Sequence, residues 1–117
     1  MADDAGQRVE PVLGVETVDG GVVVRLGGEL DLYNADGVRA ALADAIGRRP
    51  QRLVVDLAEV EFLDSTALGV LIEARSKLGK GGLALACAGA ETRRALQVSG
   101  LDRHLPVHDT VAAALAS

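Results

Sequence analysis

The sequence predicts an α/β domain with a mixed, mostly parallel sheet that opens with a β-hairpin and packs against about four helices. Its 117 residues are 49% hydrophobic and 25% charged, which suits one globular domain. Two apolar stretches flank a tight turn near the start, and strand-like runs then alternate with helical patterns. This alternation is typical of parallel βαβ units. We expect residues 1–8 to form a flexible leader and residues 9–117 to form a single domain.

The first two elements are predicted to be antiparallel strands over residues 12–18 and 22–26. The turn Asp19-Gly20-Gly21 lies between them. An Asp-Gly pair favours a hairpin because these residues tolerate the positive φ angles of tight turns. Gly27-Gly28 then marks either the end of the second strand or a bulge within it.

An amphipathic helix is expected next, with Asn34 as its N-cap, its side chain accepting from an early backbone N–H. Gly47 would end this helix in the left-handed conformation, and Pro50 blocks any continuation. The apolar positions repeat at intervals of three and four residues, as on one buried helix face: Val38, Ala41, Leu42, Ala45 and Ile46.

The second half of the chain continues the alternation and ends with a short edge strand and a last helix. Glycines mark two of the helix ends, Gly79 and Gly100. Asp109 is expected to cap the last helix. The predicted elements are a strand over 53–57, a helix over 65–78, a strand over 83–88, a helix over 91–99, a strand over 104–107 and a helix through 116.

Composition excludes several classes of function. The net charge of −5 and the presence of only one Phe, one Tyr and no Trp argue against nucleic-acid binding. Cys87 is the single cysteine, so no intrachain disulfide can form, and we expect it to be inert in an apolar strand of a cytoplasmic protein. His104 and His108 lack the neighbouring ligands of a metal site. We expect no metal, no cofactor and no membrane span.

The most informative polar residues lie where a helix is predicted to begin, at Asp64, Ser65 and Thr66. The local pattern alone favours a simple N-cap, because the first N–H groups of a helix need acceptors. If the strands before Gly28 and over residues 53–57 are parallel, however, Asp31 lies at the same edge of the sheet. Asp31, Asp64 and Ser65 would then form one acidic patch around an exposed hydroxyl.

Four motifs together resemble the anti-sigma factor antagonist family, the STAS domain. The resemblance covers residues 12 to 115, and Ala67 departs from it because family members commonly carry glycine there. The motifs are Gly28-Glu29-Leu30-Asp31, Val55-Asp56-Leu57, Phe62-Leu63-Asp64-Ser65-Thr66-Ala67-Leu68-Gly69 and Ser99-Gly100-Leu101.

The resemblance implies a non-enzymatic regulator of transcription controlled by phosphorylation. The unphosphorylated domain would bind an anti-sigma factor that is also an ATP-dependent, GHKL-type serine kinase, and so free the sigma factor. Phosphorylation at Ser65 would release the domain, and a PP2C-type phosphatase would reset it. Thr66 is the rival acceptor. The expected partner-binding residues are Asp31, Asp64, Ser65, Thr66, Leu68 and Ile72.

Two other functions stay open on the sequence. Asp56 is expected to end a buried strand, the position of the acceptor in a receiver domain phosphorylated on aspartate. Within the STAS family, the chain could instead be an accessory subunit of a lipid transporter or a component of a signalling scaffold.

Overall fold

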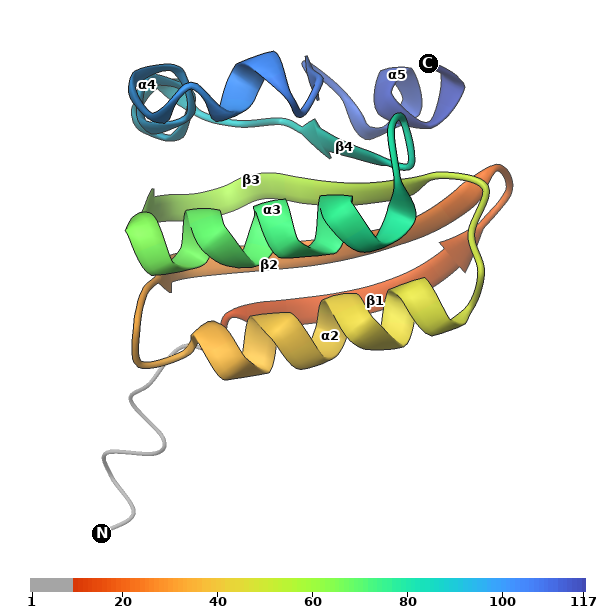
Figure 1. Cartoon of the computed structure of the whole chain (residues 1–117), viewed down its shortest axis with the longest axis horizontal. Coiled ribbons are helices and arrows are strands. Elements are labelled where there is room, and N and C mark those ends of the chain that lie inside the picture. Colours follow the sequence, from red (N-terminus) through yellow and green to blue (C-terminus); the bar gives the residue numbers. More distant parts are fainter. Residues whose placement is uncertain (1–9) are drawn as a thin grey trace, which may run out of the picture.

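The computed structural model describes residues 10–117 and shows a mixed α/β fold (Figure 1). One five-stranded sheet has the order β1-β2-β3-β4-β5. Only β1 and β2 pair antiparallel, and the other three pairs are parallel, as predicted. The strands are β1 (Val12–Val18), β2 (Gly21–Leu30), β3 (Leu53–Leu63), β4 (Leu83–Ala86) and β5 (Val107–His108). The expected leader, residues 1–8, lies outside the described residues.

Helices cover the two faces of the sheet unequally. Buried side chains of α2, α3 and α4 share one large apolar core with one face, whereas Ala114 of α5 packs with Val23, Val54 and Ala84 on the other. The helices are α2 (Ala35–Gly47), α3 (Ser65–Leu78), α4 (Ala90–Ser99), the 3-10 turn η1 (Leu101–Arg103) and α5 (Val111–Ala116). None of these helices is long and apolar enough to cross a membrane.

Strand β2 runs beyond its predicted end at residue 26 and continues to Leu30. Gly27 and Gly28 do not end it but lie at two shifts of its register with β3. Gly28 has a φ of 74°, and a Cβ on Gly27 would lie 2.9 Å from a side-chain carbon of Leu13. The positive φ favours glycine at position 28, whereas a side chain at position 27 would require Leu13 to shift, and the bulge is the correct interpretation of this pair.

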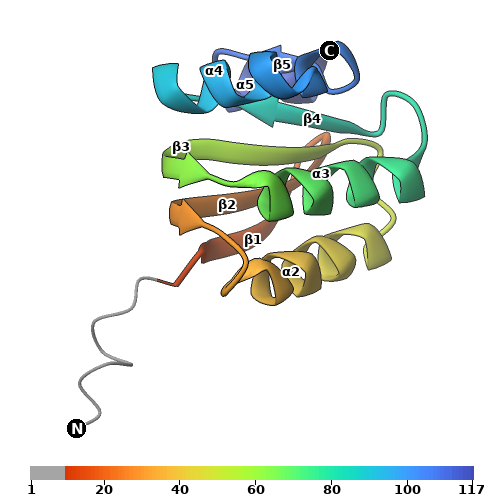
Figure 2. The same cartoon turned by 60° about the vertical axis from the view of Figure 1, so that its left-hand side comes forward.

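Strand β3 is also longer than the predicted 53–57, because it continues to Leu63. The prediction of its end was wrong because the charged residues Glu59 and Glu61 interrupt the apolar run. Leu63 pairs with Leu30, so β2 and β3 end side by side (Figure 2). Asp56 lies in the middle of β3 rather than at its end.

Two predicted roles at the ends of α2 were wrong in detail. Asn34 is the N-cap, but its side chain makes no capping bond and instead binds within the preceding loop. Gly47 is the last helical residue, and the left-handed residue is Arg49, with a φ of 53°. A cap assigned from sequence fixes the helix boundary better than it fixes the side-chain partner.

The C-terminal elements shift by a few residues from their predicted bounds. Strand β4 ends at residue 86 instead of 88, and β5 covers 107–108 instead of 104–107. Thr110 caps α5 by accepting from the N–H of Ala113, because the predicted cap, Asp109, forms an ion pair with Arg93 at 2.7 Å. Gly100 is left-handed at the end of α4, with a φ of 78°, as predicted.

Candidate functional site

Two segments meet at the carboxyl ends of β2 and β3: the loop that precedes α2 and the first turn of α3. The N–H of Asp64 donates to the carbonyl oxygen of Leu30 at 3.0 Å. The N–H of Leu32 donates to Asp64 Oδ2 at 3.2 Å. These bonds join residues 32 and 34 positions apart in the sequence and hold the loop beside the helix, as the parallel arrangement of β2 and β3 predicts.

Asp64 is the N-cap of α3. Its backbone is extended, and its Oδ1 accepts from the N–H of Ala67 at 3.0 Å. One carboxylate oxygen thus caps the helix and the other binds the loop. The capping interpretation from the local pattern is correct for Asp64.

Ser65 is the first residue of α3 and is exposed, whereas Thr66 is half-buried. The Ser65 hydroxyl forms no hydrogen bond with another residue in the described range 10–117. Ala67 is 3% exposed and its methyl group packs in the core, so its departure from the family's glycine leaves the Ser65 hydroxyl open. The structure therefore presents one accessible alcohol at the positive end of a helix.

Asp31 organises the loop and remains half-exposed. Its Oδ1 accepts from the N–H groups of Tyr33 and Asn34, at 2.9 and 3.3 Å. The side chain of Asn34 closes the other side: Oδ1 accepts from the N–H of Asp31 at 2.9 Å, and Nδ2 donates to the carbonyl of Glu29 at 2.7 Å. The loop is thus fixed by its own polar side chains.

Three exposed apolar side chains belong to the segments that form the site and were missed by the sequence reasoning. Leu32 is 65% exposed, Tyr33 86% and Phe62 54%. Phe62 and Tyr33 are the only aromatic residues of the chain. Aromatic residues usually lie in the core, so an exposed Leu-Tyr pair inside a polar turn is the signal that could have found them.

Leu68 and Ile72, expected to touch a partner, lie four residues apart on α3. Both are half-buried and pack against the main core. The structure thus bonds the loop that carries Asp31 to Asp64, next to Ser65 in the chain, and places Leu68 and Ile72 farther along the same helix. Part of each side chain remains available at the surface.

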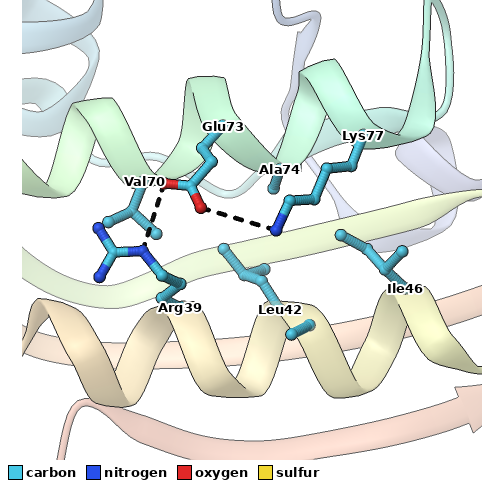
Figure 3. A pocket seen from close by; sticks show the side chains of 8 residues that line it. Arg39, Leu42, Ile46, Val70, Glu73, Ala74 and Lys77 are labelled. Carbon is cyan, nitrogen blue, oxygen red and sulfur yellow. Dashed lines mark hydrogen bonds and ion pairs between the residues drawn. The ribbon is translucent and has the colours of Figure 1, made fainter.

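A crevice between α2 and α3 carries no ligand site. Figure 3 shows Glu73 between Arg39 and Lys77, with N–O distances of 3.3 and 3.6 Å. The free volume there is about 10 Å³, room for one water molecule at most. These ion pairs are substantially exposed and contribute little to stability.

No group of His, Cys, Asp and Glu among residues 10–117 has the spacing of a metal site. The prediction that Cys87 lies inside a strand was wrong. The residue follows the end of β4, has a φ of 64° and is half-buried. Burial raises the pKa of its thiol, and the charge of Asp56 and a hydrogen bond to that side chain raise the pKa further. A thiol held protonated is a weak nucleophile and a poor metal ligand.

The comparisons with known proteins agree with this geometry. The family model of the STAS domain matches residues 13–114. An anti-sigma F factor antagonist from Paenibacillus polymyxa is 39% identical over 100 residues, which cover 82% of this chain and 85% of that protein. An anti-sigma factor antagonist from Mycobacterium paratuberculosis has a crystal structure with a TM-score of 0.82 at 38% identity, covering 90% of each chain.

The Bacillus cell fate determinant SpoIIAA, in its phosphorylated form, has a TM-score of 0.65 at 26% identity, covering 88% of this chain and 96% of that chain. Both the sequence match and the shared fold extend over most of the chain. The chain therefore belongs to the anti-sigma factor antagonist family, which is built on the STAS domain.

Proposed function

We propose that this protein is an anti-sigma factor antagonist that acts in the cytoplasm and is switched by phosphorylation of Ser65. The unphosphorylated form binds an anti-sigma factor that is also a GHKL-type, ATP-dependent serine kinase, and so frees the sigma factor. Phosphorylation releases the protein from the kinase, and a PP2C-type phosphatase restores the hydroxyl. The protein itself is a binding module and not an enzyme.

The observation that carries the proposal is the exposed hydroxyl of Ser65 at the N-terminus of α3, next to Asp64, to which the loop that carries Asp31 is bonded. A phosphate at this position would lie near the free N–H groups of the first helical turn, which tolerate negative charge. The fold therefore survives the modification. The related Bacillus protein, described in phosphorylated and unphosphorylated forms, supports this.

Release follows from charge at the interface. A phosphate adds about −1.5 to −2 charges at pH 7, next to Asp64 and on the same edge of the sheet as the loop that carries Asp31. A partner that fits the neutral hydroxyl would then bury like charges together, which costs several kcal/mol. Each 1.4 kcal/mol lowers affinity about tenfold. No large conformational change is needed.

Ser65 is a better acceptor than Thr66 because of exposure. A kinase must place the acceptor oxygen next to the transferred phosphate, so the oxygen has to be accessible. Ser65 is exposed and Thr66 half-buried. We therefore assign phosphorylation to Ser65.

The alternative of a receiver-like domain phosphorylated on Asp56 is less well supported. Asp56 lies inside β3, and its Oδ1 accepts from the N–H of Ala58 at 3.0 Å. A receiver acceptor would stand at the end of its strand. Hydroxylamine separates the two acceptors in solution, because it attacks the acyl carbon of an aspartyl phosphate and displaces the phosphate, whereas a phosphoserine has no acyl carbon to attack.

The full chain, immobilised and exposed to extract of its native cell, should retain a serine kinase that is identified by mass spectrometry. The purified kinase and ATP should then phosphorylate the chain, and peptide mapping should place a hydroxylamine-stable phosphate on Ser65. A transporter ATPase in the eluate, with no kinase, would replace this function by that of an accessory subunit.

A further inference from the structure

A groove lies between the last part of β3 and helix α4, beside the candidate site. Its volume is about 510 Å³. The residues that line it include Glu61 and Phe62 of β3 and Glu91, Arg94, Ala95 and Val98 of α4. The proposed function does not use this groove.

The topology of the sheet creates the groove. Strand β4 pairs with β3 only over residues 53–56, so the part of β3 from residue 57 to 63 has no strand neighbour on that side. Helix α4 contacts β3 there instead, and the views in Figures 1 and 2 both place it next to the end of β3. The sheet is thus left open where it approaches Ser65.

The groove contains apolar side chains that are exposed to water, which is unfavourable for apolar surface. Val98 is 80% exposed and Phe62 54%. Each is large enough to stabilise the fold if it were buried. Neighbouring exposed apolar residues with polar residues around them mark interaction sites.

Position and charge indicate the occupant. Phe62 and Leu63 line the groove at the end of β3, and α3 begins with Ser65 two residues later, so a partner that reaches Ser65 meets the β3 wall of the groove close by along the chain. Two carboxylates, Glu61 and Glu91, and one guanidinium, Arg94, line the groove together with its apolar side chains. This excess of negative charge favours a cationic partner segment.

We propose that this groove is a second docking site for the anti-sigma factor serine kinase, which inserts an apolar side chain flanked by Lys or Arg. This inference rests on the proposed function. Contacts in the groove then strengthen binding of the kinase, whereas phosphorylation of Ser65 controls its release. Ser65 does not line the groove. Contacts in the groove therefore remain after phosphorylation and contribute to the residual affinity of the phosphorylated chain for the kinase.

The test compares Val98→Glu with Gln97→Glu in the full chain. Both substitutions add one negative charge at neighbouring exposed positions of α4, but Gln97 does not line the groove. The probe is the purified kinase that phosphorylates Ser65 of the wild-type chain. We expect V98E to raise the Kd at least 10-fold and to raise the KM of the kinase for the chain, with Q97E close to wild type.

Thermal unfolding of both variants establishes that they are folded, and Phe62→Ala should weaken binding in the same direction as V98E. Equal affinities of V98E and Q97E would overturn the inference while leaving the switch at Ser65 intact. Self-association of the wild-type chain that V98E abolishes, without an effect on the kinase, would overturn it in favour of a second copy. A chain that no serine kinase phosphorylates would instead refute the proposed function.

Discussion

The carboxylate of Asp64 accepts from the N–H of Leu32 at 3.2 Å, and this bond joins the start of α3 to the loop after β2. The same carboxylate caps α3 through the N–H of Ala67. One side chain therefore positions both the proposed phosphate acceptor and the loop that carries Asp31. The geometry of the site depends on it.

Removing the carboxylate should destabilise the fold and loosen the loop. Asp64→Ala loses the cap and the bond to Leu32, and we expect the free energy of unfolding to fall by about 1–2 kcal/mol, as for other N-caps. Asp64→Asn is the matched control, since its carboxamide oxygen can still cap the helix. Urea unfolding measures both, and an Asp64→Ala variant as stable as wild type would show that the two bonds contribute nothing.

Tyr33 should contribute to binding and not to stability. It is 86% exposed, so Tyr33→Ala should change the free energy of unfolding by less than about 0.5 kcal/mol. Tyrosine is frequent among residues that dominate interface energies. We expect at least a 10-fold rise in the Kd for the purified kinase.

The matched control for Tyr33→Ala is Leu13→Ala. Leu13 is another exposed apolar residue, and it lies on β1 at the edge of the sheet. Its affinity should match that of the wild-type chain. Equal effects of the two substitutions would remove Tyr33 from the interface.

We expect Gly69 to lower the stability of α3 while keeping the surface beside Ser65 open to a partner. It lies inside α3, four residues after Ser65 and on the same side of the helix. A Cβ at Gly69 would meet no atom within 4 Å. Gly69→Ala should therefore stabilise the fold by about 0.5–1 kcal/mol but weaken binding, because the methyl group projects towards the partner. Calorimetry and a kinase titration measure the two effects, and tighter binding would contradict this role.

Cys87 gives a pH dependence of known sign. Burial and the charge of Asp56 raise the pKa of its thiol in the folded state. The stability linked to this thiol is thus fully present below the pKa of the unfolded chain and is lost as the pH rises through the folded value. Iodoacetamide should modify the folded chain with a midpoint at higher pH than the urea-unfolded chain, and coincident midpoints would contradict the shift.

Local signals predicted much of the fold. The glycines at 79 and 100 end their helices with positive φ, and the Asp-Gly turn joins β1 to β2. The capping side chains were harder to predict, because partners distant in sequence compete for them. Asp109 binds Arg93 across 16 residues and leaves the cap of α5 to Thr110.

The candidate site was predictable where it depends on topology. Parallel strands end at one edge, so the proximity of Asp31 to Asp64 followed from the order of elements. The exposure of Tyr33 and Phe62 did not follow, because an apolar residue type alone predicts burial. Only the early end of β4 and the closed turn around Asp31 show that these rings stay outside the core.

The affinity of the purified kinase for wild-type, Ser65→Ala and Ser65→Asp chains tests the central claim most directly. We expect Ser65→Ala to bind as tightly as the unphosphorylated wild type, and to stay bound in the presence of ATP, while Ser65→Asp binds at least 10-fold more weakly. Equal affinities for all three chains would contradict a switch that depends on negative charge at Ser65.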